Sequence, residues 1–414
     1  MNRHTTLAIL VGVAIALALA LPVGLRQHVG GDFHVFWQAG RNFATGAPLY
    51  HDSVPGARQL KYPPFAAMVF TPLALFSLPV AAVLVSLLNL GLWVLSAYLT
   101  RDILARTFPD RVQARYPVVL ALLLSAQFLL DNFHHVQMNG VTFALVLLGL
   151  DAYLRGRDVA SAASIVAATA LKITPIFFAA WLVIRGRRRA AVAVFFLAAA
   201  CLLVPLVLRG PSNGAAELVE YYHKFLEGHQ HGEIDSYQAG QNIAGLVSRM
   251  TRPDATEEGG SFQYLPTSER SAQRIYTALW VSVLVLFLAR LLTLRLRSAP
   301  VSAFELAMVF LTSMLLSPIT FTTHLVPLLF VFAVLLSVRP AAITGPVWIV
   351  AVMLGLGMTI SGLSGRDLGG DSIYRNVGGY SIYGWTMLVA FGTLAVAAGR
   401  KGGGEKEARR SLQS

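Results

Sequence analysis

The sequence predicts an all-α, polytopic membrane protein, and its composition is the first reason. Of the 414 residues, 55% are hydrophobic and 13% are charged, whereas soluble domains carry about 25% charged residues. Apolar runs of about 20 residues recur along the chain, which is the length that crosses a bilayer as a helix. The period-two alternation of membrane β-strands is absent. Because helices satisfy their own backbone in lipid, we expect a bundle with about ten full crossings.

The first expected element is a crossing helix over residues 7–25. Its apolar run is long for a signal peptide, and Pro22 crowds the one Ala-x-Ala cleavage candidate, so we interpret it as uncleaved. With a cytoplasmic N-terminus, this helix delivers Asp32 to the outer side. The next long run, residues 79–100, ends in arginines that should be cytoplasmic. The intervening residues 62–76 are too few for a crossing and include three prolines, which predicts a re-entrant or interfacial helix.

A hairpin of two half-length helices is expected next. The basic stretches at residues 155–158 and 185–189 should both be cytoplasmic, since positive residues favour that side. One crossing between them would violate this rule, and two full crossings do not fit at about 1.5 Å per residue. Two half-helices do fit, with Lys172 near the apex. Irregular backbone at that depth is tolerated only where it lines a cavity.

The remaining apolar runs complete the predicted topology, with both termini cytoplasmic. Outer loops are expected at residues 26–63 and 209–272, within one transmembrane unit over residues 1–399, followed by a disordered basic tail over 400–414. The net charge of +12 then reflects basic inner loops, so nucleic-acid binding is not expected. The further crossings are expected over residues 117–130, 139–154, 190–208, 273–292, 302–316, 324–338, 343–362 and 382–398.

Polar residues gather on the predicted outer face, which indicates a site. A carboxylate, several imidazoles and a mid-membrane lysine on one side are typical of a functional centre. The inner side shows arginine-rich turns instead. The outer candidates are Asp32, His34, Arg41, Tyr62, His135, Gln137, Asn139, Lys172, Gln241 and His324.

Most of these residues also have a purely structural interpretation. Asp32 would cap a helix starting at Phe33, His34 would lie on the wet face of that helix, and Gln137 and Asn139 would cap the next one. His135, with its neighbour His134, would be a solvated turn residue. Lys172 fits this interpretation least, since a mid-membrane lysine costs a few kcal/mol unless it meets an anion or water. A metal site is not expected, because the histidine pair is adjacent and no HExxH motif occurs.

Several blocks of the chain resemble glycosyltransferase family 87, in the family's order. They are "DFHVFWQAGRNFATGAPLY", "KYPPFAAMVFTPLALF", "VQMNGVTFALVLLGLDAYLRGR", "ATALKITPIFFAAWLVIRGRRRAA", "QNIAGLVSR" and "SPITFTTHLVPLLF". The resemblance implies a GT-C-type bundle with an outward-facing site, a polyprenyl-phosphate sugar donor and an aspartate general base. Asp32, Lys172 and His324 match the family's aspartate, lysine and histidine. The family's tandem histidine reads Thr323–His324 here, and its "NQSxRG" block, at residues 240–245, lacks the Asn and the Arg.

The resulting prediction is transfer of a hexose, mannose in the first instance, from a polyprenyl phosphate to a lipid or glycan acceptor. The reaction would occur at the outer face of a bacterial cytoplasmic membrane, among membrane lipids, with inversion and without metal or cofactor. Asp32 would be the base, and Lys172 and His324 would stabilise the leaving phosphate. Gln137, Asn139 and Tyr62 would help to hold the donor. His34, Arg41, Gln241 and His135 would serve the acceptor or a secondary role.

Two alternatives belong to other classes of protein. A transporter or flippase also uses discontinuous helices, but its site lies near the midplane and often between internal repeats, which this sequence lacks. A non-catalytic assembly partner would use the 209–272 segment and would not need Asp32 and Lys172 together.

Overall fold

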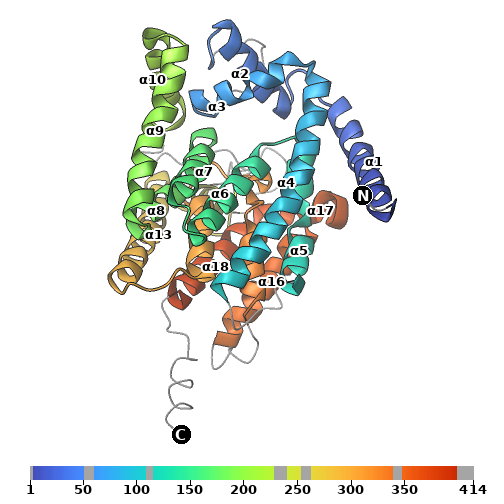
Figure 1. Ribbon diagram of the computed structural model, residues 1–414. Coiled ribbons are helices and arrows are strands. Elements are labelled where there is room, and N and C mark those ends of the chain that lie inside the picture. Colours follow the sequence, from blue (N-terminus) through green and yellow to red (C-terminus); the bar gives the residue numbers. More distant parts are fainter. Residues whose placement is uncertain are drawn as a thin grey trace.

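The computed structural model describes residues 3–50, 60–108, 115–227, 240–252, 263–338 and 347–398, and within these ranges every regular element is helical (Figure 1). The predicted fold class is therefore confirmed. The expected tail over residues 400–414 lies outside the described residues, as do parts of the 26–63 and 209–272 loops.

The helices follow the predicted apolar runs closely. The N-terminal part forms α1 (Arg3–Leu25), α2 (Asp32–Thr45), α3 (Pro64–Phe70), the 3₁₀ helix η1 (Thr71–Leu75), α4 (Leu78–Thr107), α5 (Arg115–His134) and α6 (Asn139–Leu154). The middle part forms α7 (Asp158–Leu171), α8 (Ile176–Arg185), α9 (Arg188–Leu208), α10 (Pro211–Phe225) and α12 (Ile243–Thr251). The C-terminal part forms α13 (Glu269–Leu296), α14 (Ala303–Leu315), the 3₁₀ helix η2 (Thr322–Leu325), α15 (Leu328–Leu336), α16 (Val347–Leu363), α17 (Arg366–Gly379) and α18 (Ile382–Ala397).

Helix lengths fit an integral membrane protein. Among the described residues, α4, α5, α9 and α13 are long and apolar enough to cross a bilayer, and residues of α17 with α18 form a pair bent by 55° that would make a fifth span. Several expected crossings coincide with shorter apolar helices, so the total number of crossings stays a prediction. Three helices were not expected. Helix α17 occupies residues that the hydropathy pattern assigns to an outer loop, and α10 and α12 lie within the expected 209–272 loop.

The hairpin predicted between two basic stretches has the expected form. Helices α7 and α8 have 14 and 10 residues, and the chain is extended at Lys172, with φ −151° and ψ 127°. Pro175 stands at the N-cap of α8, where its missing N–H and fixed φ are tolerated. A residue before proline avoids the helical region, so Thr174 helps to keep the two helices apart.

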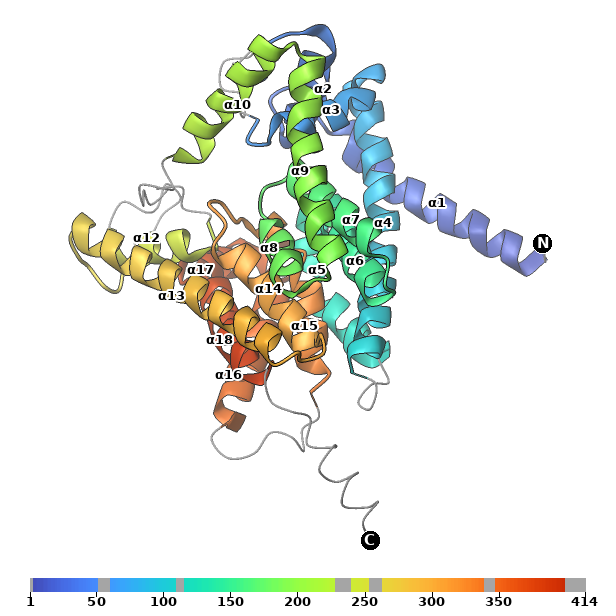
Figure 2. The same cartoon turned by 60° about the vertical axis from the view of Figure 1, so that its left-hand side comes forward.

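A small second core holds the elements that carry Asp32. The main core runs through the bundle, whereas the second is formed by α2, α3, the start of α4 and α10, with Phe33, Phe36, Tyr50, Phe70 and Tyr221 buried in it. Figures 1 and 2 show α2, α3 and α10 together at one end of the molecule. Gly40 lets α2 approach α3, because a Cβ there would lie 2.3 Å from the carbonyl oxygen of Phe70. The position of α2 is thereby fixed by packing.

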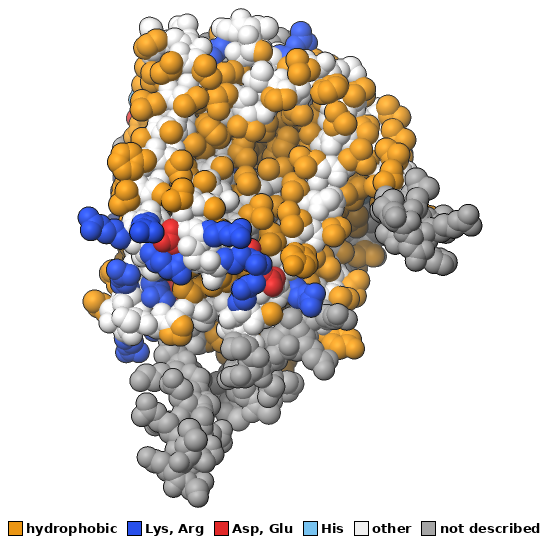
Figure 3. All heavy atoms as spheres, in the orientation of Figure 1, with side chains coloured by type: hydrophobic (Ala, Val, Ile, Leu, Met, Phe, Trp, Pro, Cys, Tyr) orange, Lys and Arg blue, Asp and Glu red, His pale blue; other side chains and the backbone are white. Residues whose placement is uncertain are grey.

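A band of charged residues crosses the surface on the other side of the apolar belt from α2 (Figure 3). Its ion pairs join the ends of α4, α6, α7 and α9, which are ends that the topology assigns to the cytoplasm. They are Arg106–Asp102, Arg155–Asp102, Arg155–Asp151 and Arg187–Asp158. The band agrees with the distribution expected of cytoplasmic loops.

Candidate active site

The turn between α5 and α6 brings Asp32 into contact with the bundle. The side chain of Gln137 donates a hydrogen bond from Nε2 to Asp32 Oδ2 at 3.1 Å. Nearby, Gln27 Nε2 donates to the carbonyl oxygen of His134 at 3.3 Å, which ties the end of α1 to the same turn. The N-cap of α2 is Gly31, and Asp32 is the first helical residue. Asp32 is therefore not the N-cap of α2, and its carboxylate contacts the α5–α6 turn.

The hairpin apex contacts the other end of this turn. Lys172 Nζ donates to Asn139 Oδ1 at 2.6 Å and lies 5.8 Å from the centre of the Tyr62 ring. Asn139 in turn donates from Nδ2 to the carbonyl oxygen of Thr323 at 2.9 Å. The Asn139 amide thus joins the hairpin to η2, and neither Gln137 nor Asn139 is the N-cap of α6, which is Met138. Among the described carboxylates, none pairs with Lys172 at ion-pair distance.

Lys172, Asn139 and His324 line one cavity that is partly open, with about 480 Å³ of empty space that includes open solvent. Its other polar lining residues are Thr142, Thr174, Ser313 and Thr320, and its apolar lining includes Phe143, Val146, Phe178, Phe310 and Met314. His324 lies in η2, before α15 begins, with Nδ1 3.2 Å from both the amide nitrogen of Phe321 and the carbonyl oxygen of Ile319. The cavity lining therefore combines one basic side chain and several polar side chains with a set of apolar ones.

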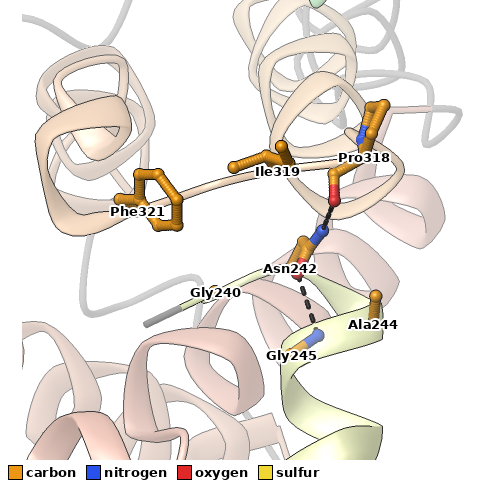
Figure 4. Close-up of a pocket in the computed structure, with 7 residues that line it drawn as sticks. All are labelled: Gly240, Asn242, Ala244, Gly245, Pro318, Ile319 and Phe321. Atoms are coloured by element: carbon orange, nitrogen blue, oxygen red, sulfur yellow. Dashed lines mark hydrogen bonds between the residues drawn. The ribbon is translucent and has the colours of Figure 1, made fainter. Parts of the chain in front are cut away.

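The residues just before η2 accept hydrogen bonds from Gln241 and Asn242, at the end of the long outer loop. Asn242 donates from Nδ2 to the carbonyl oxygens of Ser317 and Pro318 at 2.6 and 2.8 Å, and its Oδ1 caps α12 at Gly245 (Figure 4). Gln241 adds a backbone bond to Thr320 at 2.5 Å. These contacts leave a smaller, partly open cavity between the two segments. Gln241 therefore bonds to the segment before η2 and is in neither cavity lining.

Of the ten predicted site residues, Asn139, Lys172 and His324 are in the cavity lining, and Asp32, Gln137, Tyr62 and Gln241 are not. The other three predicted residues are also outside the lining. His34 is 5% exposed and packs on Trp37, so its wet-face interpretation is wrong, and burial lowers the pKa of its imidazole. Arg41 lies 4.7 Å over the Trp37 ring, nine residues and about 14 Å along the helix from Asp32. His135 is largely exposed and pairs with Asp131 at 3.2 Å, as a turn residue would.

Three residues near the site were missed from sequence. Tyr50 donates from its hydroxyl to the carbonyl oxygen of Tyr62 at 2.8 Å and packs on Tyr221 of α10. Burial raises the pKa of the Tyr62 phenol, so the ring over Lys172 stays neutral. Asp131 accepts a hydrogen bond from Thr322 in η2. Asn89 contacts the α5–α6 turn. The sequence could have pointed to it, because it is a lone amide within the apolar run of α4.

The arrangement is suited to group transfer at a hydroxyl. A carboxylate at one end of a turn can accept a proton, and a cation at the other end can stabilise a developing anion. Among the described residues, no group of three His, Cys, Asp or Glu side chains is placed to hold a metal ion.

Comparison with known proteins gives one family. The sequence model of glycosyltransferase family 87 matches residues 60–318. Two curated relatives, each named polyprenol-phosphate-mannose-dependent alpha-(1-2)-phosphatidylinositol mannoside mannosyltransferase, come from Mycobacterium tuberculosis and Mycolicibacterium smegmatis. Each is 28% identical, over 229 and 235 residues, in matches that cover 53% of this chain and 52% of the relative. The chain thus spans about half the length of the curated relatives it matches.

Two solved structures of ArnT from Cupriavidus metallidurans show a weak likeness. The form bound to undecaprenyl phosphate is 17% identical with a TM-score of 0.45, covering 94% of this chain and 78% of ArnT. The apo form is 15% identical with a TM-score of 0.42, covering 95% and 76%.

Proposed function

Since the chain belongs to glycosyltransferase family 87, we propose that it transfers a hexose from a polyprenyl phosphate to an acceptor hydroxyl at the outer face of the membrane. Mannose is the first sugar to test, because both curated relatives are named for polyprenol-phosphate-mannose. The acceptor is a lipid or a glycan, and the enzyme lies in a bacterial cytoplasmic membrane with both termini inside.

The observation that carries this proposal is the environment of Lys172. Its ammonium group lines a cavity that also has apolar lining residues, and its hydrogen-bond partner is a neutral amide. A cation so placed favours an anion in the cavity. A phosphate beside Lys172, with the isoprenoid chain leaving past the apolar side chains of the lining, would suit both kinds of lining residue. His324 and Tyr62 flank the same position.

Asp32 completes the reaction as the general base. The acceptor hydroxyl loses its proton to the Asp32 carboxylate while its oxygen bonds to the anomeric carbon. The bond from that carbon to the phosphate oxygen breaks, and polyprenyl phosphate leaves with the electron pair. Lys172 stabilises the charge that develops on this phosphate. One displacement with one base inverts the anomeric centre.

The test uses purified full-length protein in lipid nanodiscs with synthetic polyprenyl-phosphate mannose and a panel of lipid and glycan acceptors. Mass spectrometry should detect released polyprenyl phosphate and an acceptor heavier by one hexose. Polyprenyl-phosphate glucose and galactose, run in parallel, identify the sugar. Absence of hexose transfer from all of these donors to the whole panel would overturn the proposal, as would transfer at the wild-type rate by Asp32→Asn.

A further inference from the structure

We propose that Asn89 is a positioning residue for the base, because it holds the α5–α6 turn in the strained conformation that presents Gln137 to Asp32. The inference rests on the proposed function in one respect, that Asp32 is the base.

Asn89 is a polar residue in an apolar, membrane-spanning helix. It is fully buried in α4, where a side-chain amide is costly unless it forms hydrogen bonds. Its Nδ2 donates to the carbonyl oxygen of Gln137 at 3.1 Å, while its Oδ1 has no hydrogen-bond partner among the described residues. The amide oxygen is thus unsatisfied, while the amide nitrogen binds one peptide of the turn.

The residue before Gln137 is strained. Val136 has φ +47° and is fully buried, and the left-handed region is strongly disfavoured for a β-branched side chain. Such a conformation persists only where its surroundings determine it. Within the turn, Val136 and Gln137 donate backbone bonds to Phe133 and Asn132, both at 3.0 Å. The bond from Asn89 joins the backbone of the turn to α4, while the bonds from Gln27 and to Asp32 join the turn to the end of α1 and to α2.

The same amide also sets the spacing between α4 and α6. A Cβ on Gly140 would lie 2.7 Å from Asn89 Oδ1 and 3.3 Å from Trp93 Nε1. Glycine at position 140 therefore lets the start of α6 approach α4 closely enough for Asn89 to reach Gln137. Asn89 consequently fixes the turn from which Gln137 extends to Asp32.

These contacts predict that losing the Asn89 bond slows the chemical step more than it weakens donor binding. Loss of the Asn89 bond releases the Gln137 peptide and, with it, the side chain that orients the Asp32 carboxylate. Lys172 bonds to Asn139, two residues after Gln137, and Asn139 keeps a second bond to Thr323 of η2, in which Asn89 takes no part. Asn89→Leu should therefore lower kcat by roughly 10- to 100-fold, in the range that small misplacements of catalytic groups produce, and leave KM for the donor within about twofold.

The decisive experiment is rescue by a second change. Glycine adopts positive φ without the cost that valine incurs, so Asn89→Leu with Val136→Gly should recover most of the lost kcat. Val136→Gly alone should stay near wild type. Ser96→Ala is the matched control, since Ser96 is also buried in α4 with an unpartnered hydroxyl and should keep its kcat. Asn89→Ala repeats the test if the leucine variant folds poorly.

Two outcomes would overturn the inference: an unchanged kcat in Asn89→Leu, or a loss that Val136→Gly does not rescue, which would leave Asn89 as a packing residue. Hydrogen exchange of residues 133–139 provides a readout that needs no activity. It should accelerate in Asn89→Leu, and unchanged exchange would also contradict the inference. If Asp32→Asn keeps turnover while exchange does accelerate, the base assignment fails and the hold of Asn89 on the turn stands.

Discussion

Replacing Lys172 with methionine tests the donor site most directly. Methionine keeps the length and apolarity of the side chain but removes its charge, so the variant should insert in the membrane at least as well as the wild type. The loss should appear in donor binding, because the phosphate would then meet no cation at the hairpin apex.

The size of the effect follows from the contact that Lys172 makes now. An oxygen of Asn139 lies 2.6 Å from Nζ, so a phosphate oxygen taking its place would put the two charges about 4 Å apart. At an effective dielectric constant of about 20, their attraction is about 4 kcal/mol. Dehydration and the displaced Asn139 bond offset part of this, and charged hydrogen bonds contribute about 1.5 to 3 kcal/mol net. The dissociation constant of the donor should therefore rise roughly 10- to 150-fold.

The assay is equilibrium retention of radiolabelled polyprenyl-phosphate mannose by purified variants in nanodiscs. Lys172→Arg should retain part of the affinity, because the charge remains while its geometry changes. Lys224→Met, which removes a cation outside the cavity lining, is the control and should bind normally. Thermal unfolding of each variant identifies any loss that comes from misfolding.

Wild-type retention by Lys172→Met would refute the reasoning. A purely structural lysine predicts the opposite order, with methionine tolerated and arginine disruptive through its bulk. Either result would remove Lys172 from the donor site and, with it, the reason for placing the phosphate at the hairpin.

Three further predictions concern the base, the topology and a buried ion pair. Asp32→Asn should lower kcat by roughly 100-fold or more, the range of general-base loss, with an unchanged unfolding temperature; near-normal turnover would deprive Asp32 of that role. In a Cys201→Ser background, an impermeant thiol reagent should label cysteines at positions 32, 135 and 370 from outside but not those at 108, 156 and 187. Labelling of position 187 from outside would contradict the hairpin. Positions 230, expected outside, and 339, expected inside, lie beyond the described residues. Glu305→Leu should destabilise the fold by about 3 to 5 kcal/mol, because it leaves Arg185 buried at 4% exposure without its 2.7 Å partner. Adding Arg185→Leu to the same chain should restore much of the lost stability. Chemical unfolding measures both variants, and an unchanged stability of Glu305→Leu would contradict this account.

The sequence by itself determined the helical class, the hairpin and three of the residues on which the proposal depends. These features are local, because apolar runs and the distribution of arginines can be read without knowing which helices touch. The hairpin at Lys172 followed from two basic stretches too close for two crossings, and α7 and α8 have that form. Asp32, Lys172 and His324 stood out because polar residues are rare and costly beside membrane segments.

Only the tertiary structure decided how these residues are held. The partners of the amides lie far away in sequence: Asn139 reaches Thr323, and Asn89 reaches Gln137. No periodicity encodes such pairs, which depend on how helices are rotated against one another. The same reason explains where the side chains of His34 and Arg41 point, because the packing of the apolar face of α2 on α3 sets the rotation of α2. It accounts for the conformation of Val136 as well, since a left-handed valine is unfavourable in an isolated chain and exists here because neighbouring helices enforce it.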